Sequence, residues 1–299
     1  MNQGQANPYM PLPEWNQPEP YFTDFKASRH IMLAHWRPWR VAPDDKRKPV
    51  NRMPFSAGAL LNIYPDAIEI GAPLGAEDNT ELGMLFTAAM LVIALMAVGF
   101  GIAVWESDSA GAIAASLMVF LFGAFAFLAA AMFFRLARWS VRDVPVLFNR
   151  RTRQVSFFEL EPFPYLRFWK KQRATSPRTR SWDGARVRSY KMSQFSGPTR
   201  QERYCISLLW GEPGNPSSCA DIVDFGFAQL WGDDRLWPLY EHIRRYMEED
   251  GAPIGRGDSL RWAKRGELLA FPPDILAAAG GPALDEQQVE DLARGRARP

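Results

Sequence analysis

Residues 82–105 read LGMLFTAAMLVIALMAVGFGIAVW and residues 110–134 read AGAIAASLMVFLFGAFAFLAAAMFF, two runs of 24 and 25 residues without a charged side chain. An α-helix rises about 1.5 Å per residue, so about 20 apolar residues cross a hydrocarbon core about 30 Å thick. Only the four residues ESDS separate the two runs. The pattern predicts a transmembrane helical hairpin over 82–134. The alternative is a pair of helices buried in a large soluble core, which needs runs of only about 14 apolar residues.

Charge is unevenly distributed around this hairpin, although the net charge of the chain is only +2. Residues 135–200 hold 16 Lys/Arg against 4 Asp/Glu, and residues 201–299 hold 11 against 17. Lysine and arginine close to a membrane span stay on the cytoplasmic side. The basic flank after the second run therefore predicts two passes, with both termini inside and the ESDS turn outside.

The sequence offers little catalytic or metal-binding chemistry. Two cysteines, Cys205 and Cys219, are too few for a disulfide framework, so we expect free thiols; one bridge between neighbouring strands is the alternative. His30, His35 and His242 lack the spacing of a metal site, and His242 is expected in solvent. No motif for nucleophilic, zinc-dependent or phosphate-transfer catalysis occurs. We therefore expect no metal, no cofactor and no catalytic residue.

Strand patterns lie on both sides of the hairpin. Residues 57–71 read as two strands around a Tyr64-Pro65-Asp66 turn, and alternating apolar patterns resume over 144–148, 154–159, 185–190, 204–210 and 220–227. Two strands alone are barely stable, so residues 55–73 are expected to pair with strands after 144. Two unrelated soluble pieces are the alternative.

A helix and a tail follow the strands. Apolar residues recur at spacings of three and four from Leu236 to Met247, which predicts an amphipathic helix with Asp233 or Asp234 as its N-cap. The predicted fold is an α+β membrane protein. It is an antiparallel β-roll of about seven strands, like a pleckstrin-homology (PH) domain, closed by this helix and interrupted by the hairpin. A short helix over 274–279 and a polar tail from about Asp285 are expected after it.

These patterns divide the chain into five segments. Residues 1–54 are expected to form an extended N-terminal arm. Its Trp36 and Trp39 are expected either in irregular structure packed on the domain or at the membrane interface. The other segments are the first strands (55–81), the hairpin (82–134), the rest of the β-domain with its helix (135–250), and a C-terminal extension (251–299).

Three motifs resemble those of a known family: VLFNRRTRQVSFF at 146–158, the Trp182-Asp183 pair, and LWPLYEHIRRYMEED at 236–250. Together they resemble a domain-of-unknown-function family of proteobacterial two-helix inner-membrane proteins, often encoded beside type VI secretion genes. The resemblance covers about residues 55–275. It implies a bacterial inner-membrane location and a role beside secretion, as an immunity protein, an effector-handling factor or occasionally an effector. It carries over no catalytic residue.

Two charged groups are the candidate binding residues. A basic stretch interleaved with aromatic residues is expected to contact anionic lipid; nucleic acid or a plain solvated face are the alternatives. Its residues are Arg167, Lys170, Lys171, Arg173, Arg178 and Arg180. An acidic side is expected to stay free for a protein partner, an effector or a secretion component. Its residues are Asp221, Asp224, Asp233 and Asp234.

The functional hypothesis is a membrane-anchored cytoplasmic protein that binds a partner and is not an enzyme. The two apolar runs carry no ionisable side chain, which argues against transport. Its small residues indicate close helix packing, either within the hairpin or between copies. The alternative function is a secreted effector whose hairpin inserts into a target membrane.

Overall fold

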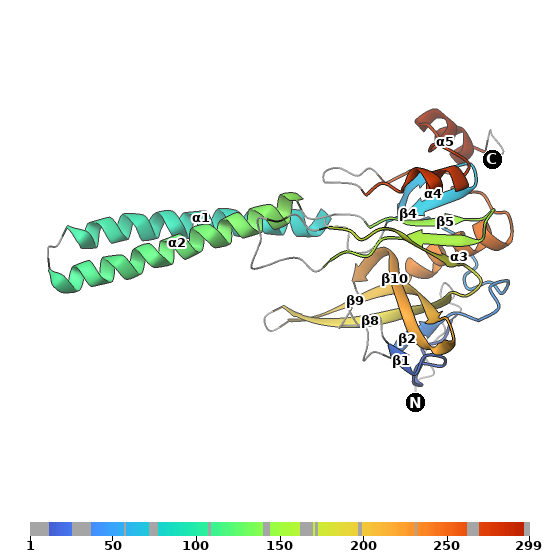
Figure 1. Cartoon of the computed structure of the whole chain (residues 1–299), viewed down its shortest axis with the longest axis horizontal. Coiled ribbons are helices and arrows are strands. Elements are labelled where there is room, and N and C mark those ends of the chain that lie inside the picture. Colours follow the sequence, from blue (N-terminus) through green and yellow to red (C-terminus); the bar gives the residue numbers. More distant parts are fainter. Residues whose placement is uncertain are drawn as a thin grey trace.

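A computed structural model describes residues 12–25, 37–56, 58–71, 77–106, 109–139, 144–161, 170, 173–196, 199–230, 232–261 and 269–295. Figure 1 shows a body of strands and short helices, from one side of which two long helices project together. These helices are α1 (Glu77–Trp105) and α2 (Ala110–Trp139). The two apolar runs are therefore helical, as predicted, and lie largely outside the body.

The first sheet joins the strands that flank the two helices in sequence. Its order is β3-β4-β5-β6-β7, and all four pairings are antiparallel. β4 pairs with β5 directly, with Ile68 opposite Phe148 and Ile70 opposite Val146. The predicted pairing across the hairpin is thus confirmed. The strands are β3 (Leu60–Ile63), β4 (Ala67–Ile70), β5 (Val146–Asn149), β6 (Gln154–Phe157) and β7 (Arg178–Ser181).

The second sheet has the order β1-β10-β9-β8-β2. Three long strands form its centre: β8 (Arg186–Ser196), β9 (Thr199–Glu212) and β10 (Asn215–Leu230). Two short N-terminal strands, β1 (Asp24–Phe25) and β2 (Pro38–Val41), supply its edges. The prediction of a purely extended arm over 1–54 is therefore wrong for these residues, which pair with strands more than 140 positions away.

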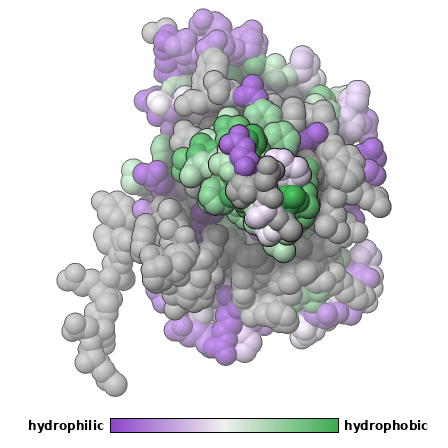
Figure 2. Space-filling model, turned by 90° about the vertical axis from the view of Figure 1, so that its left-hand side faces the viewer, coloured by the Kyte–Doolittle hydropathy of each residue, from purple (hydrophilic) through white to green (hydrophobic). Residues whose placement is uncertain are grey.

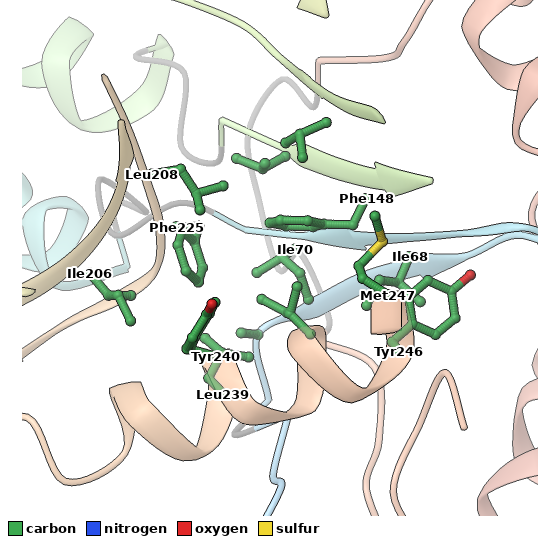
Figure 3. Close-up of a cluster of buried hydrophobic side chains, with 14 of the residues drawn as sticks. Ile68, Ile70, Phe148, Ile206, Leu208, Phe225, Leu239, Tyr240, Tyr246 and Met247 are labelled. Carbon is green, nitrogen blue, oxygen red and sulfur yellow. The ribbon is translucent and has the colours of Figure 1, made fainter. Parts of the chain in front are cut away.

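A helix between the two sheets holds the body together. α3 (Leu236–Glu248) contributes Leu239 and Tyr240 to a buried cluster that also contains Phe148 of the first sheet and Leu208 and Phe225 of the second. Figure 3 shows these side chains converging on one face of the helix. The predicted helix is confirmed, but its N-cap is Arg235 rather than an aspartate.

The close approach of α3 to β10 depends on one glycine. Gly226 has φ +87° at an irregularity in the pairing of β10 with β9, and its N–H donates to the carbonyl of Gly71. A Cβ at this position would lie 2.5 Å from Leu239 Cδ2. Only glycine accepts both this backbone angle and this contact without strain.

Two segments for which no helix or strand is predicted are regular. Residues 178–181, which none of the predicted strands includes, form the edge strand β7. The expected polar tail forms α5 (Glu286–Ala293), because Asp285 and Gln288 make a capping box that satisfies the first backbone donors. The short helix expected over 274–279 is present as α4 (Pro273–Ala278).

The N-terminal residues from 37 onward pack on the body. Trp39 lies against the main core, and its ring centroid is 5.8 Å from that of Tyr204. Trp39 is therefore packed on the domain, as one of the two alternatives predicts, but it lies in strand β2 and not in irregular structure. Trp36 lies outside the described residues.

Candidate functional site

The apolar surface of α1 and α2 is uncovered, and most of the exposed large hydrophobic side chains among the described residues lie on it. The most apolar segments, Gly83–Trp105 and Gly111–Arg135, are long and apolar enough to cross a membrane. In the most apolar 18 residues of each, only 22% and 17% are buried. Figure 2 views the pair end-on, with hydrophobic residues at the centre and mostly hydrophilic residues among those coloured around the rim of the body. Core helices of a soluble protein would be covered, and these are not.

Small residues set the distance between α1 and α2. A Cβ at Gly101 would lie 2.7 Å from Cε1 of Phe120, and one at Gly123 would lie 3.2 Å from the Cβ of Ala97. At Gly99, a Cβ would have no atom within 4 Å. Packing within the hairpin therefore accounts for Gly101 and Gly123, but not for Gly99.

Few polar groups lie between the two helices. Thr87 is buried and its hydroxyl donates to the carbonyl of Gly83 at 2.8 Å, which satisfies it within α1. Ser116 is buried on α2, and its hydroxyl has no hydrogen-bond partner among the described residues. The apolar runs 82–105 and 110–134 contain no ionisable group that could relay a proton or bind an ion.

The predicted basic and acidic surfaces meet one another. Asp221 is only 1% exposed, and its carboxylate accepts from Arg178 Nη1 and Arg180 Nε, each at 2.6 Å. The expectation that Asp221 is free for a partner is therefore wrong. The guanidinium groups of Arg178 and Arg180 are engaged in joining β7 to β10 across the two sheets.

The other predicted acidic residues are placed differently from one another. Asp233 is also 1% exposed, because Arg40 Nε and Trp237 Nε1 donate to its carboxylate at 3.0 and 2.9 Å. The expectation of an exposed Asp233 is wrong. Asp224 is half-buried and accepts from the hydroxyl of Ser207, while Asp234 is exposed.

The remaining basic candidates are at the surface or outside the described residues. Lys170 and Arg173 are exposed. Arg167 and Lys171 lie outside the part of the chain that the structure describes. Arg178 is exposed as well, but its guanidinium is paired with Asp221, so Lys170 and Arg173 are the described candidates that we retain for lipid contact.

A cavity of about 1240 Å³ lies between the first sheet and the C-terminal segment. Leu61, Phe271 and Val289 contribute apolar walls. Glu69 is buried in the lining, and its Oε2 accepts from Asn62 Nδ2 and from the Tyr64 hydroxyl, both at 2.9 Å. Burial and the Glu69 charge raise the pKa of Tyr64, which stays a neutral donor. The site is large and carries a few oriented polar groups, as small-molecule sites do.

No sequence pattern predicts this cavity, since its lining comes from residues about 200 positions apart. The expected free thiols are present, because Cys205 and Cys219 are buried and unbridged. No group of metal-binding side chains occurs among the described residues.

His242 is buried, so the expectation of a solvent-exposed imidazole is wrong. Its Nε2–H donates to the carbonyl of Pro253 at 3.1 Å. Burial lowers the pKa of His242, and the bond to Pro253 and the charge of Asp258 oppose this only in part. The imidazole is a neutral packing group rather than a titrating surface group.

Comparison with known proteins adds no relative. No family model matches the chain, and neither a curated protein nor a solved structure matches it.

Proposed function

We propose that this chain is a two-pass membrane protein whose body acts by binding. The observation that carries the proposal is the uncovered apolar surface of α1 and α2, two adjacent helices of 29 and 30 residues. In water, an exposed apolar surface of this length would favour aggregation, whereas in a bilayer it faces lipid. The body, which holds nearly all the charged residues, then stays at the membrane surface.

The proposed orientation places the body and both termini in the cytoplasm of a bacterium, with the hairpin in the inner membrane. Arg135 and Arg138 at the body end of α2 support it, because basic residues beside a span stay inside. β8 and β9 extend from the body on the side from which the helices leave (Figure 1). Lys170 and Arg173 are the proposed contacts with anionic lipid.

The finer description of the body as a PH-like roll belongs to the same proposal. A meander of strands ending at β7, a second meander of β8 to β10, and a helix after the last strand support it. The edge strands β1 and β2 and the parallel pairing of β1 are additions to such a roll.

The partner we propose is a protein of a type VI secretion system, with this chain as an immunity or effector-handling protein that does not catalyse a reaction. The support is the resemblance of the motifs at 146–158 and 236–250. The second candidate is a secreted membrane-inserting effector. The exposed apolar hairpin favours it equally, and expression separates the two, since an effector without its partner is toxic and an immunity protein is not.

The decisive experiment separates the hairpin from the body. Because β4 and β5 pair directly, residues 77–139 can be replaced by a short Gly/Ser linker without breaking the first sheet. The full chain should stay in the membrane fraction after alkaline carbonate washing. The linker variant should be soluble and should unfold cooperatively. Release of the full chain by carbonate would contradict the membrane proposal.

Orientation needs a second measurement. A reporter fused after Pro299 should be active only in its cytoplasmic form, and a reporter inserted in the turn at 106–109 only in its periplasmic form. The opposite pattern would overturn the cytoplasmic placement while leaving the two spans intact.

A further inference from the structure

The face of the second sheet that points away from α3 is apolar at its centre. Along β9, Ile206 and Leu208 belong to the main core, while Cys205 and Leu209 belong to a separate cluster on the opposite face, as the two-residue period of a strand requires. Neighbouring strands add Tyr190, Cys219 and Ile222 to this second cluster. All of these side chains are buried, so something covers the face.

The cover is residues 19–25 of the same chain, which we call the strap. Phe22 is buried in the second cluster, and Tyr21 and Phe25 pack against it. The backbone contribution is small: β1 pairs parallel with β10 over two residues, and Thr23 N–H donates to the Ser217 carbonyl at 2.9 Å. Most of the hold on the strap therefore comes from side chains.

Two arginines of β8 recognise the strap. Arg186 and Arg188 are two positions apart and share a face of the strand. The Arg188 guanidinium is 1% exposed and pairs with the Glu19 carboxylate through Nη2 at 3.2 Å and Nε at 3.3 Å. The Arg186 guanidinium lies 4.3 Å from the ring centroid of Tyr21.

We propose that this face is a docking groove for an extended peptide segment with a carboxylate three residues before a buried aromatic ring. The strap occupies the groove as an intramolecular ligand of that chemistry. A protein partner that carries the same pattern would exchange with the strap. The proposal concerns the body alone and holds whether or not the hairpin crosses a membrane.

The ion pair is the feature that distinguishes a recognition groove from a plain cover. An apolar side chain at position 188 would cover the face at no electrostatic cost, because buried ion pairs rarely stabilise a fold more than apolar residues of similar size. Arginine instead makes the groove selective for a carboxylate at one position. Addition of a strand to a sheet edge, with side chains read in pockets, is a recurrent mode of peptide recognition.

The two cysteines beneath the strap provide the readout. Burial, with the charges of Asp221 and Glu19, raises the pKa of Cys219 to about 12, and burial raises that of Cys205 as well. Both thiols should resist a maleimide in the full chain held in mild detergent. The double variant Glu19→Gln with Phe22→Ala should label at least about tenfold faster, because losing one buried ring changes a local opening equilibrium by that much. The exposed Glu14→Gln is the matched control and should label like the wild type.

Exchange is tested with a peptide of residues 12–25, LPEWNQPEPYFTDF, added to the double variant. The peptide should slow thiol labelling to near the wild-type rate, and a peptide carrying Lys for Glu19 and Ala for Phe22 should not. Should the double variant fail to fold, Glu19→Gln alone replaces it, since it keeps shape and ring. Unchanged labelling in a folded variant, or no protection by the peptide, would overturn the proposal.

Discussion

Replacing Glu241 by glutamine tests whether a buried ion pair on α3 fastens the N-terminal residues to the body. Glu241 is fully buried and accepts from Arg244 Nη2 at 2.7 Å, from Arg245 Nε at 2.7 Å and from Val50 N–H at 3.0 Å. Removing one partner of such a pair costs about 3–5 kcal/mol, because the remaining charge stays buried. We expect about 3 kcal/mol, the lower end of that range. Arg244 keeps Glu249 at 2.7 Å and backbone carbonyls at 3.2 and 3.3 Å.

Thermal unfolding in mild detergent, followed by tryptophan fluorescence, measures this loss. For a domain of this size about 1 kcal/mol lowers Tm by about 2–4 °C, so Glu241→Gln should lower it by about 6–12 °C. Trypsin should also cleave faster within 46–52, where Arg244 binds the carbonyls of Lys46 and Arg47. Glu249→Gln, which removes the half-exposed partner, is the control and should lower Tm by at most about 2–4 °C.

The pH dependence gives the same prediction a second check. Burial by itself would raise the pKa of Glu241, but the donors from Arg244, Val50 and Arg245 outweigh it and hold the pKa below 4.5. The folded pKa lies below the unfolded one, so the stabilisation is complete above about pH 4.5 and is lost as pH falls through the folded pKa. The Tm difference between wild type and Glu241→Gln should therefore shrink in acid. A Tm for Glu241→Gln within about 2 °C of wild type at neutral pH would refute the reasoning.

Three further substitutions test the packing, each against a matched site. Gly226→Ala should destabilise the body by about 1–3 kcal/mol more than Gly214→Ala, since both positions have φ +87° but only Gly226 has a side chain against it; equal losses in denaturant titrations would contradict the contact with α3. Gly101→Leu should destabilise the hairpin in detergent while Gly99→Leu should not, because only Gly101 faces the other helix; a loss at Gly99 instead would indicate a second copy on that side. His242→Gln should flatten the pH dependence of Tm below about pH 6.5. In the wild type, the unfolded chain binds a proton at His242 below that pH while the buried imidazole of the folded chain does not, so stability falls as the pH is lowered. An unchanged slope in the variant would mean that another group titrates.

The elements of the fold could be predicted wherever hydropathy alone decides. The apolar runs, the stripe of α3 and the alternating patterns of β4 to β6 each mark a local structure in a few residues. Pairing of β4 with β5 across the inserted helices followed from the instability of a lone hairpin. The strands β1 and β2 could not be found this way, because Pro38 and Asp24 belong to short edges whose pairing depends on distant partners.

The sequence pattern did not predict which polar residues are buried, for a different reason. His242 and Glu241 lie on the polar side of the α3 stripe, which an amphipathic helix normally exposes. Here residues 46–52 cover Glu241, and Arg244 and Arg245 donate to backbone carbonyls of that segment. The Pro253 carbonyl lies against His242. A periodic pattern shows which face of a helix is apolar, but it cannot show that a second segment covers the other face.

The charge distribution along the sequence led to wrong predictions of exposure at the candidate site. Residues 135–200 and 201–299 looked like separate basic and acidic surfaces, yet the fold pairs them with each other. Arg178 and Arg180 meet Asp221, Arg153 meets Glu248, and Arg150 meets Asp250. Each of these pairs joins residues between 41 and 100 positions apart. Opposite charges on facing strands and helices attract one another in the folded state. A stretch of sequence with an excess of one charge therefore predicts a charged surface only when no stretch of the opposite charge packs against it. In this chain the acidic residues of 201–299 are the complement of the basic stretch, so a partner site should be sought among charged groups outside these ion pairs.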